Sequence, residues 1–111
     1  MKIQHNKLVR DKIPEIIKDS GNQYETTTLS NLDYIEALSE KLVEEAKEVA
    51  TASPDKLTEE LADVMEVIET LIAATGIELE TVREIQKEKR SLRGGFDNKI
   101  KLLWTISSSN Q

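Results

Sequence analysis

Two adjoining helical patterns, joined at Ser53-Pro54, limit the possible folds of this chain more than any other feature. Before the turn, the apolar stripe consists of Ile35, Leu38, Leu42, Ala46 and Val49. After it, the stripe consists of Leu57, Leu61, Val64, Ile68 and Leu71, widened by Val67 and Ala74. Recurrence every three or four residues is the period of amphipathic α-helices. The sequence therefore predicts two long antiparallel helices.

Acidic clusters flank this turn on both sides. Glu44, Glu45 and Glu48 precede it, and Glu60 and Asp63 follow it. Residues three or four apart share one side of a helix, so an antiparallel pair would bring the two clusters together. At about 100° per residue, Glu60 falls inside the apolar arc of its helix, where a carboxylate is costly unless its charge is compensated.

A divalent cation is the natural compensation for several converging carboxylates. Mg²⁺ in particular is held by a few carboxylates together with water and substrate phosphate, and Mn²⁺ is a possible substitute. The alternative is that these glutamates form an ordinary solvated helix surface. The matching second cluster and the place of Glu60 in the apolar arc favour the metal site.

The acidic pattern also resembles that of a known superfamily. Glu44-Glu45-x-x-Glu48 followed by Glu60-x-x-Asp63 is similar to the EExxE…ExxD pattern of the all-α nucleoside triphosphate pyrophosphatases, which include MazG-like proteins. Residues 6–14 (NKLVRDKIP) and 93–96 (RGGF) resemble the phosphoribosyl-ATP pyrophosphohydrolase-like branch. The resemblance spans roughly residues 6–103, and the 11 residues between Glu48 and Glu60 are few for this family, which implies a tight turn.

The resemblance implies Mg²⁺-dependent hydrolysis of a nucleoside or deoxynucleoside triphosphate, or a related nucleotide, to a monophosphate and pyrophosphate, with house-cleaning as one possible role. It implies Glu45, Glu48, Glu60 and Asp63 as metal ligands. Glu44 lies roughly 100° from Glu45 around the helix, so we expect it to miss the metal and act as general base. Two alternatives stay open: a phosphoribosyl-ATP pyrophosphohydrolase of histidine biosynthesis, and a non-catalytic helical interaction module.

Four basic residues are candidates for binding substrate phosphates. Lys89 and Arg93 lie one helical turn apart and lead into Gly94-Gly95, where the backbone can approach a ligand closely. Arg10 and Lys12 are weaker candidates in the N-terminal segment. For all four, the alternative is an ordinary solvated or snorkelling side chain.

Length and composition support one all-α domain over residues 1–111, with a disordered tail at 106–111. Only 4% of the residues are aromatic and 32% are charged, which suits long helices. The expected helices cover residues 14–20, 31–52, 54–75 and 78–92, and Ser53 is expected to cap the third with Pro54 as its first residue. The two long helices have apolar arcs wider than one partner would cover, so we expect a homodimer or homotetramer.

The net charge of −6 argues against a nucleic-acid partner, because phosphate backbones need a positive surface. A nucleotide substrate is compatible with it. There is no cysteine, which excludes disulfides and thiolate chemistry. We find no signal peptide and no run long enough to span a membrane, so a cytoplasmic protein is expected.

Overall fold

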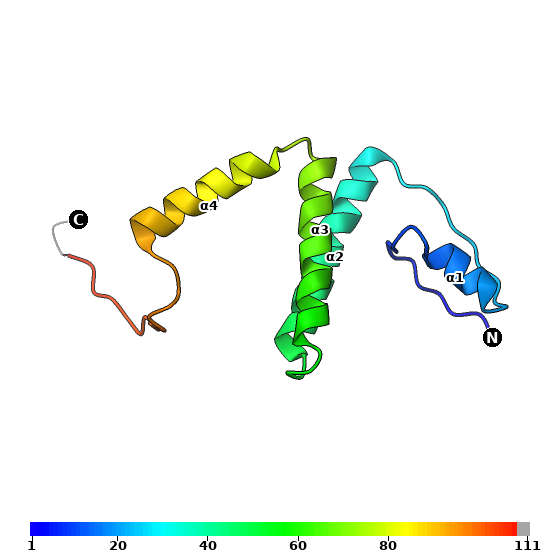
Figure 1. The fold of residues 1–111 in the computed structure, drawn as a ribbon, viewed down its shortest axis with the longest axis horizontal. Coiled ribbons are helices and arrows are strands. Elements are labelled where there is room, and N and C mark those ends of the chain that lie inside the picture. The colour runs from blue at the N-terminus through cyan, green and yellow to red at the C-terminus, as the bar shows by residue number, and fades with distance from the viewer. Residues whose placement is uncertain (109–111) are drawn as a thin grey trace. The chain divides into compact units, whose positions relative to one another are not determined.

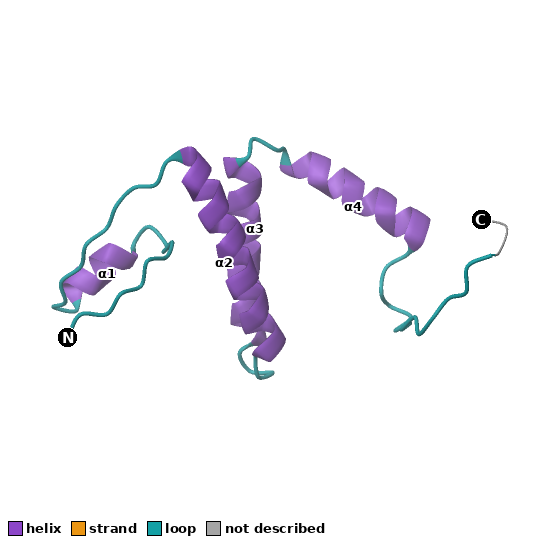
Figure 2. Ribbon diagram, turned by 180° about the vertical axis from the view of Figure 1, so that it is seen from behind, coloured by secondary structure: helices purple, strands orange, loops and turns teal. Residues whose placement is uncertain are grey.

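The computed structural model describes residues 1–108, and these contain four helices and no strand (Figure 2). The helices are α1 (Ile13–Asp19), α2 (Asn31–Thr51), α3 (Leu57–Ala74) and α4 (Leu79–Arg93). The predicted all-α fold is therefore confirmed. The chain divides into two compact units, Met1–Leu79 and the part from Glu80 onward. A single domain over residues 1–111 stays a prediction. Of the predicted disordered tail, residues 109–111 lie outside the described part, and 106–108 contain no helix or strand.

Helices α2 and α3 run antiparallel side by side and are joined by a short turn (Figure 1). Their interface contains the two apolar side chains that are buried within the described residues. These are Leu38 of α2, 3% exposed, and Val67 of α3, 8% exposed. Both belong to the apolar arcs expected from the sequence. The helix pair is the scaffold that places the two acidic clusters.

Ser30 and Asn31 are the two caps that the sequence offers for α2, and the structure uses Ser30, whereas the predicted cap of α3 is not formed. The Ser30 hydroxyl accepts a hydrogen bond from the Asp33 backbone N–H at 3.2 Å, as in an N-cap. Ser53 was expected to cap α3 with Pro54 as its first residue, and this prediction was wrong. The Ser53 hydroxyl instead donates to the Asp55 carboxylate at 2.6 Å, so it does not serve the helix N-terminus. Residues 54–56 form a turn, and α3 begins at Leu57.

The apolar arc of α3 is covered on one side only. Val67 is buried, and Val64 and Leu71 are partly buried. Further round the helix, by roughly 80° to 160° from Val67, lie side chains that stay exposed. This uncovered flank consists of Leu57, Leu61, Met65 and Ile68, which are 38%, 46%, 55% and 39% exposed. Helix α2 likewise leaves Leu32 and Val43 exposed.

The second unit contains most of α4 and the segment that follows it. After Arg93 the described chain forms no further helix or strand. Large apolar side chains along this segment are mainly exposed, among them Phe96, Ile100 and Trp104. Within residues 1–108, none of the helices combines the length and the apolar character needed to cross a membrane.

Candidate metal centre

Three carboxylates from the two long helices converge on the α2–α3 pair. Glu45 of α2 and Glu60 and Asp63 of α3 each offer one oxygen atom, and these three atoms lie within 4.8 Å of one another. Glu60 and Asp63 share a side of α3 because they are three residues apart, and the antiparallel packing brings Glu45 opposite them. All three side chains are partly buried. Their oxygen chemistry and their mutual proximity fit a hard divalent cation.

The electrostatics of this cluster are most unfavourable at Glu60. Partial burial raises the pKa of the Glu60 carboxyl above its usual value, and the negative charges of Glu48, Asp63, Glu45 and Glu59 raise it further. Within residues 1–108, no cation pairs with Glu60. A bound cation would relieve both the desolvation and the repulsion. Glu60 is therefore the carboxylate of this group that a bound cation would stabilise most.

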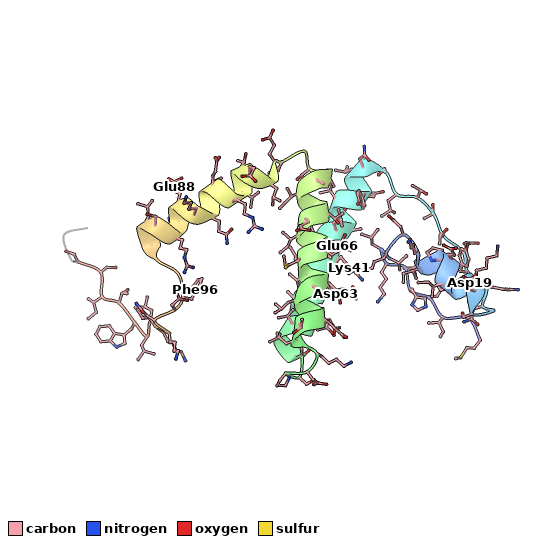
Figure 3. The ribbon with its side chains drawn as sticks, viewed as in Figure 1. Asp19, Lys41, Asp63, Glu66, Glu88 and Phe96 are labelled. Carbon is pink, nitrogen blue, oxygen red and sulfur yellow. The ribbon has the colours of Figure 1, made fainter. Side chains whose placement is uncertain are left out.

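The other carboxylates of the centre already have cationic neighbours. Lys41 Nζ lies 3.5 Å from Glu45 Oε1 and 3.6 Å from Glu44 Oε1, at the i,i+4 and i,i+3 positions of α2. Arg10 Nη2 donates to Asp63 Oδ1 at 2.8 Å. Lys41 and Asp63 are labelled on the helix pair in Figure 3. Part of the negative charge of the centre is thus balanced by the chain itself.

Two of the predicted acidic residues lie outside the converging group. Glu48 offers no oxygen within the 4.8 Å limit that joins the other three, although its charge contributes to the raised pKa of Glu60. Glu44 faces two lysines, Lys41 at 3.6 Å and Lys7 at 3.4 Å. Glu48 as a ligand and Glu44 as general base stay predictions.

The N-terminal and C-terminal basic candidates have different surroundings. Arg10 reaches the centre through Asp63, whereas Lys12 stands as the N-cap residue of α1, and no ion pair or side-chain hydrogen bond involves it within residues 1–108. Lys89 and Arg93 belong to the second unit and are exposed, and no ion pair involves either of them in the part of the chain that the structure describes. Their role in binding phosphate stays a prediction.

The chain that follows α4 forms an open hollow of about 250 Å³ lined by residues 93–100. Gly94 has φ +81, a left-handed conformation that glycine adopts without strain. A Cβ on Gly95 would lie 2.6 Å from Arg90 Nη1, so Gly95 leaves room for the Arg90 guanidinium. That guanidinium donates to Asp97 at 3.2 Å. Arg90 is exposed and its guanidinium can move, so the positive φ of Gly94 is the feature of this segment that favours glycine.

Two lysines near these sites, Lys7 and Lys99, were missed by sequence reasoning. Lys41 precedes Glu44 and Glu45 by three and four residues on one helix, so helical spacing alone already indicates its pairing with Glu44. Lys99 lines the hollow after α4 and adopts a positive φ of 60, which its local sequence does not signal. Lys7 lies 37 residues from Glu44, its ion-pair partner, and no local pattern predicts that contact.

Comparison with known proteins gives one family. The model of the phosphoribosyl-ATP pyrophosphohydrolase family matches residues 6–90. This range includes the N-terminal segment, all five predicted acidic residues and Lys89, and it ends before Arg93 and the two glycines. Neither the curated proteins nor the solved structures gave a significant match.

Proposed function

The chain belongs to the phosphoribosyl-ATP pyrophosphohydrolase family and is a nucleotide pyrophosphohydrolase, and we propose that it cleaves a nucleoside or deoxynucleoside triphosphate in a Mg²⁺-dependent reaction. The products would be a monophosphate and pyrophosphate. The observation that carries this proposal is the convergence of Glu45, Glu60 and Asp63 within 4.8 Å, inside the matched residues. A house-cleaning role, in which unwanted nucleotides are removed, is consistent with this substrate class.

The metal ion would be held by the three converging carboxylates, Glu45, Glu60 and Asp63. Glu48 lies beside them as a further carboxylate. When bound, a divalent ion supplies positive charge for the phosphate oxygens and the leaving pyrophosphate, and makes a water more acidic. The helix pair contributes by fixing the three carboxylates before substrate arrives, because Glu45 and the two α3 residues are held by packed helices.

Glu44 is the proposed general base. It lies next to a metal ligand in sequence but points elsewhere round α2, toward Lys7 and Lys41. The two ammonium groups would compete with a water for the Glu44 oxygens. Substrate phosphates, which attract the same lysines, would free this carboxylate to accept a proton from the attacking water.

Basic side chains would bind the phosphates of the substrate. Lys89 and Arg93 are proposed for this role because both are exposed cations without an ion-pair partner among residues 1–108 and lie one turn apart at the end of α4. Arg10 and Lys12 are further candidates. Arginine suits the role because its planar guanidinium can donate two parallel hydrogen bonds to a phosphate.

The family match favours a second candidate substrate, phosphoribosyl-ATP, which would place the reaction in histidine biosynthesis. Both substrates contain the same triphosphate, so the acidic centre does not separate them. The test is a pyrophosphate-release assay with Mg²⁺ across ribonucleotides, deoxynucleotides and phosphoribosyl-ATP. Release from none of them, by protein shown to be folded, would contradict the proposed function.

A homodimer or homotetramer is part of the proposal. The uncovered flank of α3, Leu57, Leu61, Met65 and Ile68, supports it, because four apolar side chains in a row on one helix are a stripe that a second helix can cover. The very small buried core supports it too, since Leu38 and Val67 are the only buried apolar side chains within residues 1–108. A second copy of the chain is the partner proposed for this flank.

A further inference from the structure

The segment before α1 crosses to both long helices through two ion pairs. Lys7 Nζ lies 3.4 Å from Glu44 Oε1 on α2, and Arg10 Nη2 lies 2.8 Å from Asp63 Oδ1 on α3. The paired residues are 37 and 53 positions apart in sequence. One partner is the proposed general base and the other is a proposed metal ligand. The N-terminal segment is therefore joined to the centre at two functional carboxylates.

Arg10 and a metal ion would compete for the same carboxylate. A guanidinium at 2.8 Å makes a charge-assisted hydrogen bond to Asp63, and a divalent ion draws on the same negative charge. The pair is readily broken, because both side chains are substantially exposed, 59% for Arg10 and 41% for Asp63. Exposed ion pairs contribute little to stability. Breaking the ion pair between Arg10 and Asp63, so that Arg10 can bind another anion, therefore costs little free energy.

The backbone of Arg10 can stay in place while its side chain moves. Its carbonyl accepts a hydrogen bond from the Ile13 N–H at 3.0 Å, in the turn that leads into α1. Only the long side chain has to change partner, from a carboxylate to another anion close by. A phosphate of a nucleotide held at the metal is such an anion, and it offers the geometry that a guanidinium binds best.

We propose that Arg10 is a metal-linked phosphate ligand: it pairs with Asp63 in the metal-free enzyme and transfers to a substrate phosphate once a divalent ion has taken Asp63. This inference rests on the proposed function. Lys7 would behave similarly toward Glu44, leaving that carboxylate free when substrate is bound. The segment would then couple substrate binding to metal binding, because a metal ion on Asp63 removes the carboxylate that competes with the substrate phosphate for Arg10.

The first test measures binding without turnover. Arg10→Gln should tighten Mn²⁺ binding to the protein alone by about two- to fivefold, the size of one exposed ion pair, because the competing charge is gone. The same variant should weaken binding of a non-hydrolysable triphosphate analogue in the presence of Mn²⁺ by about tenfold or more, the size of a charge-assisted hydrogen bond. Mn²⁺ binding can be followed by electron paramagnetic resonance and analogue binding by calorimetry.

A matched control separates the role of Arg10 from the loss of any positive charge. Lys18→Gln removes the same charge from α1, where Lys18 forms no ion pair within residues 1–108. It should change both affinities by less than about twofold, as expected for a screened surface charge. The proposal is overturned if Arg10→Gln behaves like Lys18→Gln, or if it changes metal and analogue binding in the same direction.

A second test needs no loss of Arg10. In wild-type protein labelled with ¹⁵N, the Arg10 side-chain signal, assigned with Arg10→Lys, should shift on adding Mg²⁺ and shift again on adding the analogue. A signal unmoved by both additions would overturn the exchange even if Arg10→Gln proved unstable. Failure of the proposed function looks different: wild-type protein would then bind no metal and release no pyrophosphate from any nucleotide.

Discussion

At the scale of single residues, Glu60 combines partial burial with like charges and has no cationic partner among residues 1–108. Its charged form is therefore disfavoured in the folded protein. Lys41 and Arg10 ease the same problem for Glu45 and Asp63, so the three carboxylates of the centre are not equivalent. The metal should matter most to the residue that has no other compensation.

We expect Glu60→Gln to abolish the rise in melting temperature that Mg²⁺ or Mn²⁺ produces in the wild type. A ligand that binds only the folded state stabilises it by about 2.7 kcal/mol at a hundredfold excess over its Kd, and the variant lacks a ligand oxygen with full charge. Thermal melts with and without millimolar metal measure this. A wild-type melting temperature that neither Mg²⁺ nor Mn²⁺ changes would count against the proposed metal centre.

The pKa of Glu60 also predicts a dependence of stability on pH. A carboxyl with a raised pKa binds more protons in the folded than in the unfolded state between its ordinary pKa of 4.5 and its higher folded value. The free energy of unfolding of metal-free protein should therefore decrease as the pH rises through that range. Glu60→Gln should lack this contribution. The free energies of unfolding of the two proteins, measured by urea melts, should therefore become similar at the lower pH values of this range. Parallel pH profiles would show that Glu60 is not the cause.

Glu44 and Glu48 should differ in the kind of defect that their loss produces. Glu44→Gln should lower kcat by about 10²–10⁴-fold with little change in the Mg²⁺ requirement, because a general base acts mainly in the chemical step. Glu48→Gln should instead raise the Mg²⁺ requirement and recover activity at high metal. Steady-state rates at several Mg²⁺ concentrations measure both. Near-normal turnover of Glu44→Gln would mean that this residue serves only its lysine contacts.

At the scale of the elements, the two long helices begin in different ways. Helix α2 has a serine cap that satisfies the Asp33 N–H, whereas α3 starts after a turn in which the Ser53 hydroxyl is engaged with Asp55. A serine side chain therefore stabilises the N-terminus of α2 but not that of α3. Substitution of each serine by alanine allows a matched comparison.

Ser30→Ala should lower the free energy of unfolding by about 1 kcal/mol, because the N-terminal N–H groups of α2 lose a side-chain acceptor. Ser53→Ala should cost clearly less, since its hydroxyl makes no cap bond to α3. Chemical denaturation of both variants measures the difference. Equal losses would mean that the Ser53–Asp55 turn stabilises the helix pair as strongly as a cap does.

At the scale of the whole molecule, the described chain leaves far more large apolar side chains exposed than buried. The uncovered flank of α3 is continuous along one side of the helix, and the segment after α4 adds Phe96, Ile100 and Trp104. Contiguous apolar surface of this kind marks interaction sites. The proposed assembly with further copies of the chain would cover the flank of α3.

Light scattering should therefore report a dimer or tetramer at micromolar concentration. Met65→Glu should shift the protein toward monomer or destabilise it strongly, because it places a charge in the middle of the uncovered flank. The control is Glu66→Gln, an exposed residue about 100° from Met65 round the same helix, which should leave the assembly unchanged. A wild-type monomer that unfolds cooperatively would refute the proposed assembly.

The sequence by itself determined the four helices, most of their ends and the convergence of acids across the turn. These follow from helical periodicity and from capping residues such as Ser30, which act over a few positions. The start of α3 was misplaced because the side chain of Ser53 had a second partner, Asp55, that competes with the cap.

Only the tertiary structure decided which charges meet. Glu45 joins Glu60 and Asp63 while Glu48 stays outside, because small rotations of packed helices decide which of two neighbouring side chains reaches the partner helix. The contact of Arg10 with Asp63 joins residues 53 positions apart. It depends on the path of the intervening chain, and helical periodicity contains no information about that path.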